Sequence, residues 1–123
     1  MNIAHLEDDL IQQTAFRELA ESLGHQVTSF VQVEPFKSAL KDSEFKLIVL
    51  DNLLEDYVDS FEQLEIIRSI VGPAVGIVGL TGAAAFSELK IAYPNLGLMN
   101  HVLFKPASID DLESAIFFIG GEG

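Results

Sequence analysis

Five short apolar runs alternate with amphipathic segments, and this alternation restricts the fold more than any other feature of the chain. The runs are rich in β-branched or aromatic residues and too short for helices. They are Asn2–Leu6, His25–Phe30, Leu47–Leu50, Val75–Leu80 and Val102–Phe104. Strands that alternate with helices favour right-handed crossovers, so the sequence predicts an α/β fold with a doubly wound, five-stranded parallel sheet.

The segments between these runs have helical patterns. The expected helices are Leu10–Leu23, Phe36–Leu40, Phe61–Val71, Ala83–Ala92 and Ile109–Ile119. In the first of them, apolar residues recur every four positions from Ile11 to Leu23. Ser60 precedes the third and has Gln63 three residues on, which predicts a capping box. The order of elements is therefore β-α repeated along the chain.

Composition narrows the class of protein. The chain has 123 residues, no cysteine, and 19 acidic against 7 basic residues. That length predicts one domain over residues 1–123, and the net charge of −12 argues against binding nucleic acid or anionic membranes. The first residues resemble no signal peptide and no stretch is long enough to span a bilayer, so we expect a cytoplasmic protein.

Chemically useful side chains follow four of the predicted strands. Glu7 and Asp8 follow the first strand, Asp51 the third, Thr81 the fourth and Lys105 the fifth. Any one acid after a strand is commonly the cap of the next helix. In a parallel sheet, however, these ends share one edge, where ligands bind. Three close acids favour a hard divalent cation, and a nearby hydroxyl and ammonium suit a phosphoryl group.

Over essentially its whole length the chain resembles the receiver domain of two-component response regulators, similar to the stand-alone chemotaxis response regulator. Four pieces in family order carry the resemblance: Leu6-Glu7-Asp8-Asp9, Leu47-Ile48-Val49-Leu50-Asp51, Gly79-Leu80-Thr81-Gly82 and Leu103-Phe104-Lys105-Pro106. The resemblance implies a flavodoxin-like sheet with strand order 2-1-3-4-5. It also implies a phosphorylated signalling module rather than a dedicated enzyme, assisting only its own phosphorylation and dephosphorylation.

The resemblance also assigns the metal and the phosphoryl group. Asp51 is implied as the phosphoacceptor, and Asp8, Asp51 and the backbone carbonyl of Leu53 as Mg²⁺ ligands. Glu7 completes the acidic pocket, in contact with the ion directly or through water. The implied phosphodonor is a sensor histidine kinase or a histidine phosphotransfer protein. The output is expected to be a contact with an unidentified downstream protein, made by a monomer or weak dimer without nucleic acid or membrane.

The switch residues follow the family pattern only in part. Thr81 is implied to contact the phosphoryl oxygens and Lys105 to pair with the phosphoryl charge. Pro106 is implied to follow the lysine through a cis bond. The family's switch aromatic, three residues before the lysine, is replaced by Val102, so a rotating ring is not available at that position.

Two further positions bear on the lifetime of the phosphorylated state. In the family, side chains two positions after the phosphoacceptor and two after the threonine flank the approach of hydrolytic water. Here they are Leu53 and Ala83, which offer no hydrogen bond, so slow dephosphorylation is expected. The acidic stretch from Leu53 to Asp59 also departs from the family in length.

Two alternatives remain open at this stage. The first is a pseudo-receiver, with the same fold acting as a phosphorylation-independent interaction module, favoured by Val102 and the unusual loop. The second is a haloacid-type hydrolase, which requires an aspartate two positions after the nucleophile, where this chain has Leu53. The complete set of acids, threonine and lysine favours the phosphorylated receiver.

Overall fold

The computed structural model describes residues 1–42, 44–52, 60–82, 86–105 and 109–120, and within them five strands form one parallel sheet. The strand order is β2-β1-β3-β4-β5, as the resemblance implied. The strands are β1 (Asn2–Leu6), β2 (Gln26–Phe30), β3 (Leu47–Asp51), β4 (Gly76–Thr81) and β5 (His101–Phe104). Each begins and ends within one residue of its prediction, and the predicted fold class is confirmed.

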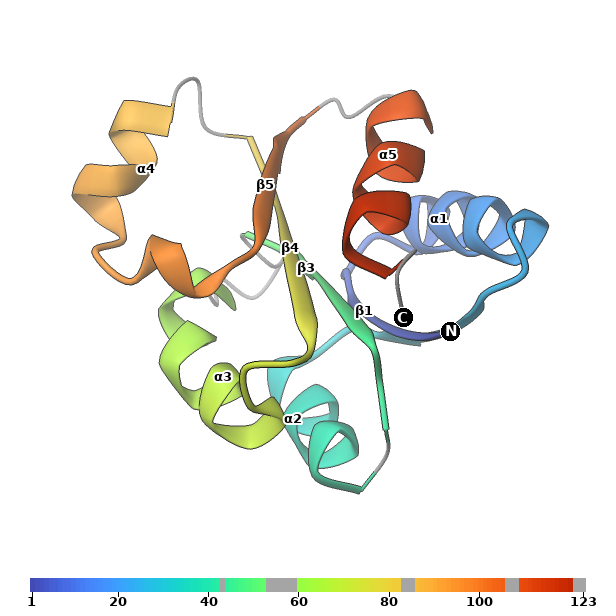
Figure 1. Ribbon diagram of the computed structural model, residues 1–123, viewed down its shortest axis with the longest axis horizontal. Coiled ribbons are helices and arrows are strands. Elements are labelled where there is room, and N and C mark those ends of the chain that lie inside the picture. Colours follow the sequence, from blue (N-terminus) through green and yellow to red (C-terminus); the bar gives the residue numbers. More distant parts are fainter. Residues whose placement is uncertain (43, 53–59, 83–85, 106–108, 121–123) are drawn as a thin grey trace.

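Helices cover both faces of the sheet (Figure 1). The helices are α1 (Leu10–Ser22), α2 (Val33–Asp42), α3 (Leu64–Val71), α4 (Phe86–Ala92) and α5 (Ile109–Gly120), with short 3₁₀ helices η1 (Ser60–Gln63) and η2 (Leu96–Leu98). In Figure 1, α1 and α5 lie side by side on one face, whereas α2 and α3 lie on the other. The sequence analysis did not predict η2 as a helical turn.

The alternation of side chains along β1 divides the core in two. Ala4 and Leu6 pack with residues of α2 and α3, whereas Ile3 packs with residues of α1 and α5. All five residues of β3 are buried, as expected for a central strand covered on both faces. Burying one large aliphatic side chain contributes about 1.5–3 kcal/mol, so this double layer supplies most of the driving force for folding.

The buried face of α1 is not the row of apolar residues that lie four positions apart. Phe16 and Ala20 face the core together with Gln13, whereas Ile11 is 82% exposed and Leu23 is 38% exposed. A spacing of four overshoots the 3.6-residue period, so a row of residues four apart drifts around the helix. The predicted helix is confirmed, and its buried face is formed by residues at spacings of three and four.

The capping box expected at Ser60 and Gln63 is wrong. These residues form η1, and the cap of α3 at Gln63 makes no side-chain hydrogen bond. The Ser60 hydroxyl instead donates a hydrogen bond to the backbone carbonyl of Asp51, and its N–H donates to the carbonyl of Asn52 at 2.9 Å. A tertiary partner at the end of β3 therefore takes the hydroxyl that would have capped the helix.

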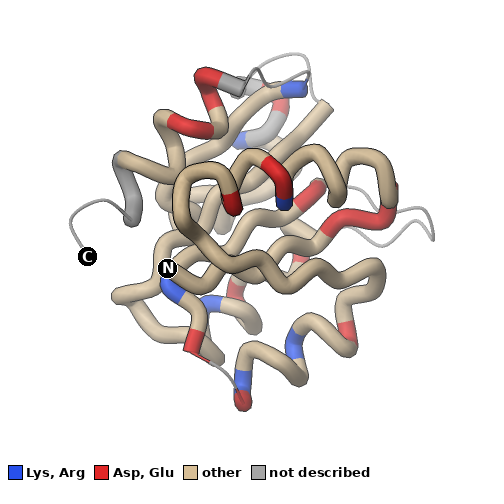
Figure 2. Tube along the Cα trace, turned by 90° about the vertical axis from the view of Figure 1, so that its right-hand side faces the viewer, with Lys and Arg blue, Asp and Glu red and all other residues tan. Residues whose placement is uncertain are grey.

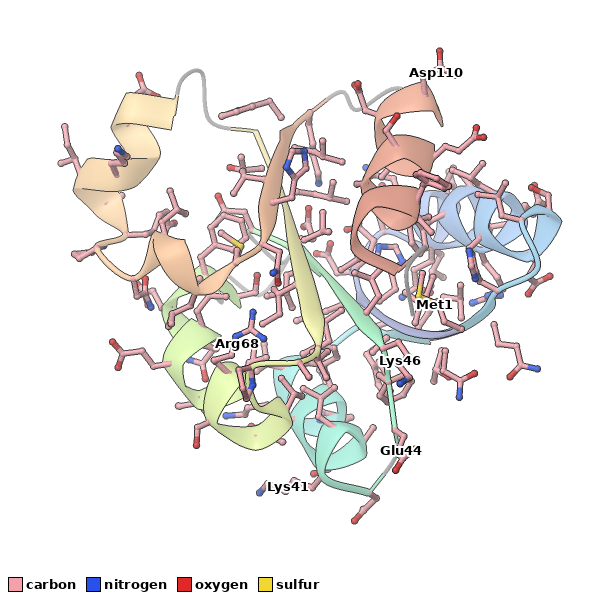
Figure 3. All side chains as sticks on the ribbon, viewed as in Figure 1. Met1, Lys41, Glu44, Lys46, Arg68 and Asp110 are labelled. Carbon is pink, nitrogen blue, oxygen red and sulfur yellow. The ribbon has the colours of Figure 1, made fainter. Side chains whose placement is uncertain are left out.

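Arg68 of α3 ties the helix to the segments that lead into β4 and β5 (Figure 3). Its guanidinium donates to the carbonyl oxygens of Leu98 at 2.6 Å, Val75 at 2.6 Å and Gly72 at 2.9 Å. It also reaches Asn100 Oδ1 at 3.1 Å, and that oxygen accepts from the N–H of Ile77 at 2.8 Å. One side chain thus supplies hydrogen bonds to several backbone carbonyls that have no partner in a helix or strand ladder.

Acidic residues are spread over several elements rather than gathered on one (Figure 2). Among the helices that the structure describes, none has the length and hydrophobicity needed to cross a membrane.

Candidate functional site

The register of the sheet brings the predicted site residues to one edge. Leu6 pairs with Leu50, and Thr81 pairs with Phe104, so β1, β3, β4 and β5 end at nearly the same level. Asp51 is the last residue of β3 and lies one step beyond Leu50. The residues that follow β1 and β5 are therefore placed beside it.

Three carboxylates meet at this edge. One oxygen from each of Glu7, Asp8 and Asp51 lies within 4.8 Å of the others. Glu7 is 1% exposed and Asp51 is 3% exposed, whereas Asp8 is half-buried. The neighbouring Asp9 has the ordinary structural role of an acid after a strand, because its Oδ1 accepts from the N–H groups of Ile11 and Gln12 and caps α1.

Lys105 supplies the positive charge of the site. Its backbone N–H donates to the carbonyl of Thr81 at 2.7 Å, which positions the residue after β5 beside β4. Its ammonium forms an ion pair with Asp51 Oδ1 and lies 3.9 Å from Glu7 Oε1. One ammonium therefore faces two buried carboxylates, and the described part of the cluster carries an excess of negative charge.

Burial, together with the neighbouring charges, shifts the pKa values of both buried acids. Burial raises the pKa of Asp51, while the ion pair with Lys105 opposes that rise. For Glu7, burial and the neighbouring charge of Asp51 raise the pKa to about 7, with Lys105 only partly offsetting them. The two carboxylates are therefore unequal: Lys105 favours the ionised form of Asp51, and Glu7 holds a proton more readily.

Gln13 supports Glu7 from α1. Its side-chain amide donates to the backbone carbonyl of Glu7 at 2.5 Å and to that of Phe30 at 3.3 Å. The N–H of Asp9 lies 3.5 Å from Glu7 Oε2. The sequence analysis did not single out Gln13. The sequence signal that marks it is its position three residues before Phe16, on the same side of the predicted helix.

Thr81 is linked to two residues that the sequence analysis did not single out. Its Oγ1 donates to Asn52 Oδ1 at 2.7 Å, and Asn52 Nδ2 donates to Tyr93 Oη at 3.2 Å. Asn52 follows Asp51 directly, which is a sequence signal for a place at the site. Tyr93 lies far along the chain, between α4 and η2, and no local pattern marks it.

The donor set fits a hard divalent cation. Glu7 Oε1 is buried and has no hydrogen-bond partner within the described residues, although Lys105 lies near it. Three carboxylates supply only oxygen donors, which is the chemistry that Mg²⁺ prefers, with water filling the remaining positions. The residues on this edge are therefore suited to holding Mg²⁺.

Some of the predicted site residues are not placed by the structure. Leu53, Ala83 and Pro106 lie outside the described residues, as does the loop from Leu53 to Asp59.

Val102 is half-buried and pairs with Gly79 in the register of β4 and β5. A side chain at position 79 would lie 2.6 Å from both Met99 and Phe61, so only glycine fits there without displacing the core.

Comparison with solved structures identifies the fold by name. The chain resembles the receiver domain of a Francisella response regulator, with a TM-score of 0.84, 20% identity, and coverage of 98% of this chain and 97% of that chain. It resembles equally the receiver domain of a sensor histidine kinase from Pseudomonas aeruginosa PAO1, solved with magnesium in the active-site cleft. That match has a TM-score of 0.82, 22% identity, and coverage of 98% and 97%.

A third similar structure is a response regulator from Burkholderia pseudomallei with a phosphorylated aspartic acid and a calcium ion. It matches with a TM-score of 0.79 and 18% identity, over 93% of this chain and 65% of that chain. No family model matches the sequence, and no curated protein matches it. The chain therefore has the receiver, or CheY-like, fold.

The raised pKa of Glu7 predicts how stability depends on pH in metal-free protein. In the folded chain this pKa is about 7, against an ordinary value of 4.5. Between these two pH values Glu7 is therefore protonated more fully in the folded state than in the unfolded state. The free energy of unfolding attributable to Glu7 therefore falls as pH rises through this window. Glutamine does not titrate, so the free energy of unfolding of Glu7→Gln lacks this fall. Measured relative to wild type, it should rise by about 1–3 kcal/mol as the pH goes from 4.5 to 7.

Urea unfolding with a chelator present, repeated across this pH range, measures the difference between the two proteins. Taking a difference removes the contribution of His5, whose pKa burial lowers to about 3. Glu21→Gln, at an exposed glutamate of α1, is the matched control. A stability difference that stays constant with pH would contradict the assignment.

Proposed function

We propose that this chain is a phosphorylation-controlled receiver domain of two-component signalling, with Asp51 as the phosphoacceptor. The observation that carries the proposal is the ion pair between Lys105 and Asp51, at an edge where Glu7 and Asp8 add two more carboxylates. The receiver fold of the whole chain supports it. So do the magnesium ion and the phosphorylated aspartate in two of the similar structures.

The proposed reaction is transfer of a phosphoryl group from a phosphohistidine of a sensor kinase or phosphotransfer protein. A carboxylate oxygen of Asp51 forms the new bond to phosphorus, and the bond from phosphorus to the imidazole nitrogen breaks. The electron pair of that bond returns to the imidazole, which takes up a proton. Lys105 favours the ionised form of Asp51 before transfer and faces the phosphoryl charge afterwards.

Other residues contribute binding and orientation. Mg²⁺, when held by Asp8, Asp51 and the Leu53 carbonyl with Glu7 beside it, supplies positive charge that neutralises phosphoryl oxygens. Thr81 presents a hydroxyl at the end of β4 as a hydrogen-bond donor to the transferred group. This chemistry modifies the protein itself, so we propose a signalling module and not a dedicated enzyme.

A phosphorylation-independent interaction module is the second candidate. Val102 favours it, because the position lacks the switch aromatic that receiver domains carry. The paired charges of Lys105 and Asp51 favour phosphorylation instead, since a module that only binds partners has no use for costly buried carboxylates.

The direct test is incubation with Mg²⁺ and a small acyl phosphate, followed by intact mass measurement. Wild type should gain the mass of one phosphoryl group, and Asp51→Asn should gain none because it lacks the nucleophile. Asp42→Asn, at an exposed aspartate that ends α2, is the matched control and should behave like wild type. Absence of the gain in wild type, or its persistence in Asp51→Asn, would count against this function.

We further propose that Leu53 and Ala83 slow hydrolysis of the aspartyl phosphate. Neither side chain can orient a water molecule by hydrogen bonding, so the contribution of positioning to dephosphorylation is small. Leu53→Asn and Ala83→Glu should each shorten the half-life of the phosphorylated protein. The measurement is the decay of the phosphorylated mass after removal of the donor. Equal or slower decay in both variants would refute this part of the proposal.

A further inference from the structure

A hydrogen-bonded chain runs from the phosphoryl-binding edge to a tyrosine outside the sheet. Thr81 Oγ1 donates to Asn52 Oδ1 at 2.7 Å, and Asn52 Nδ2 donates to Tyr93 Oη at 3.2 Å. The Tyr93 ring then packs edge-on against Phe61, with ring centroids 5.4 Å apart. We call these three side chains, from Thr81 through Asn52 to Tyr93, the relay.

We propose that the relay carries the phosphorylation signal from Thr81 to Tyr93. The inference rests on the proposed function of Asp51 as phosphoacceptor. A threonine hydroxyl has one proton, so a hydroxyl that donates to a phosphoryl oxygen no longer donates to Asn52 Oδ1. The amide of Asn52 then loses a hydrogen bond in a half-buried place, which favours its reorientation.

The backbone of Asn52 is held, so its side chain is the part that responds. Its N–H donates to the carbonyl of Leu80 at 2.8 Å, and its own carbonyl accepts from the N–H of Ser60 at 2.9 Å. A response of Asn52 to phosphorylation is therefore expected as rotation about its side-chain torsions. Because the two ends of one amide contact Thr81 and Tyr93, rotation that follows the loss of one contact also breaks the other.

Tyr93 connects the relay to the molecular surface. With Val102, Lys90 and residues of η2 it lines a groove of about 590 Å³ between the α4–η2 segment and β5. Val102 brings an aliphatic side chain to this groove, and Tyr93 supplies a phenol ring from a different element. A change in the position of Tyr93 therefore alters the shape and polarity of a surface that a partner protein can contact.

Intrinsic fluorescence tests the relay, because the chain has no tryptophan and only two tyrosines. In a Tyr57→Phe background, tyrosine emission reports Tyr93 alone. Addition of a small acyl phosphate with Mg²⁺ should change this emission. The change should be lost when Asn52→Ala is added. It should be retained with Asn95→Ala, a half-buried asparagine near Tyr93 whose side chain makes no capping hydrogen bond.

Coupling of this kind is reciprocal, which supplies a second measurement. If Thr81 must leave Asn52 to bind a phosphoryl oxygen, then Asn52→Ala should bind beryllium trifluoride, a reversible phosphoryl analogue, more tightly. The expected gain is roughly two- to tenfold, the factor that one net neutral hydrogen bond contributes. Tyr93→Phe keeps the ring against Phe61 and should change affinity in the same direction. A purely structural role for Asn52 predicts weaker binding or none of this gain.

Intact mass, measured on the same samples, distinguishes failure of the relay from failure of the proposed phosphoacceptor function. Phosphate gain without any change in Tyr93 emission, or without tighter analogue binding in Asn52→Ala and Tyr93→Phe, overturns the relay and leaves the proposed function standing. Absence of phosphate gain in both wild type and Tyr57→Phe overturns the proposed function, and the relay with it. Phosphate gain, an emission change that needs Asn52, and tighter binding together support the relay.

Discussion

The ion pair between Lys105 and Asp51 is the interaction on which the rest of the site depends. Parallel strands bring their carboxyl ends to one edge, and here that edge buries two carboxylates almost completely. Buried charge of one sign is costly unless an opposite charge faces it. Lys105 satisfies Asp51 directly but lies 3.9 Å from Glu7, so the site is left short of positive charge. A site with this excess of negative charge favours the binding of a cation, and of an anionic group that the cation also contacts.

Much of this arrangement was predictable from the sequence because its causes are local or topological. The apolar runs define the strands, and the alternation with helices predicts the parallel sheet. Parallel topology then places Glu7, Asp8, Asp51, Thr81 and Lys105 at one edge without any knowledge of side-chain contacts. The structure bears out the fold, brings the three carboxylates and the Lys105 ammonium together, and places Thr81 at the same edge beside Asn52. The roles of these residues in phosphoryl transfer are proposals.

The parts that the sequence did not reveal depend on partners far along the chain. Ser60 matches a capping motif, yet its hydroxyl bonds to the carbonyl of Asp51 because the chain returns past the end of β3 at that point. The contact of Asn52 with Tyr93 joins residues 41 positions apart. The buried face of α1 includes Gln13, a polar residue whose amide donates to the backbone carbonyl of Glu7. No local pattern encodes such pairings.

The central claim is that this sheet edge is a divalent-cation site poised for phosphoryl chemistry, and titration calorimetry with Mg²⁺ tests it most directly. Measurements at pH 6.5 in buffers of different ionisation enthalpy also count protons. The account predicts one binding site, release of up to about one proton as Glu7 loses its own, and weaker binding in Asp8→Asn. Absence of Mg²⁺ binding, or binding that Asp8→Asn leaves unchanged, would contradict it.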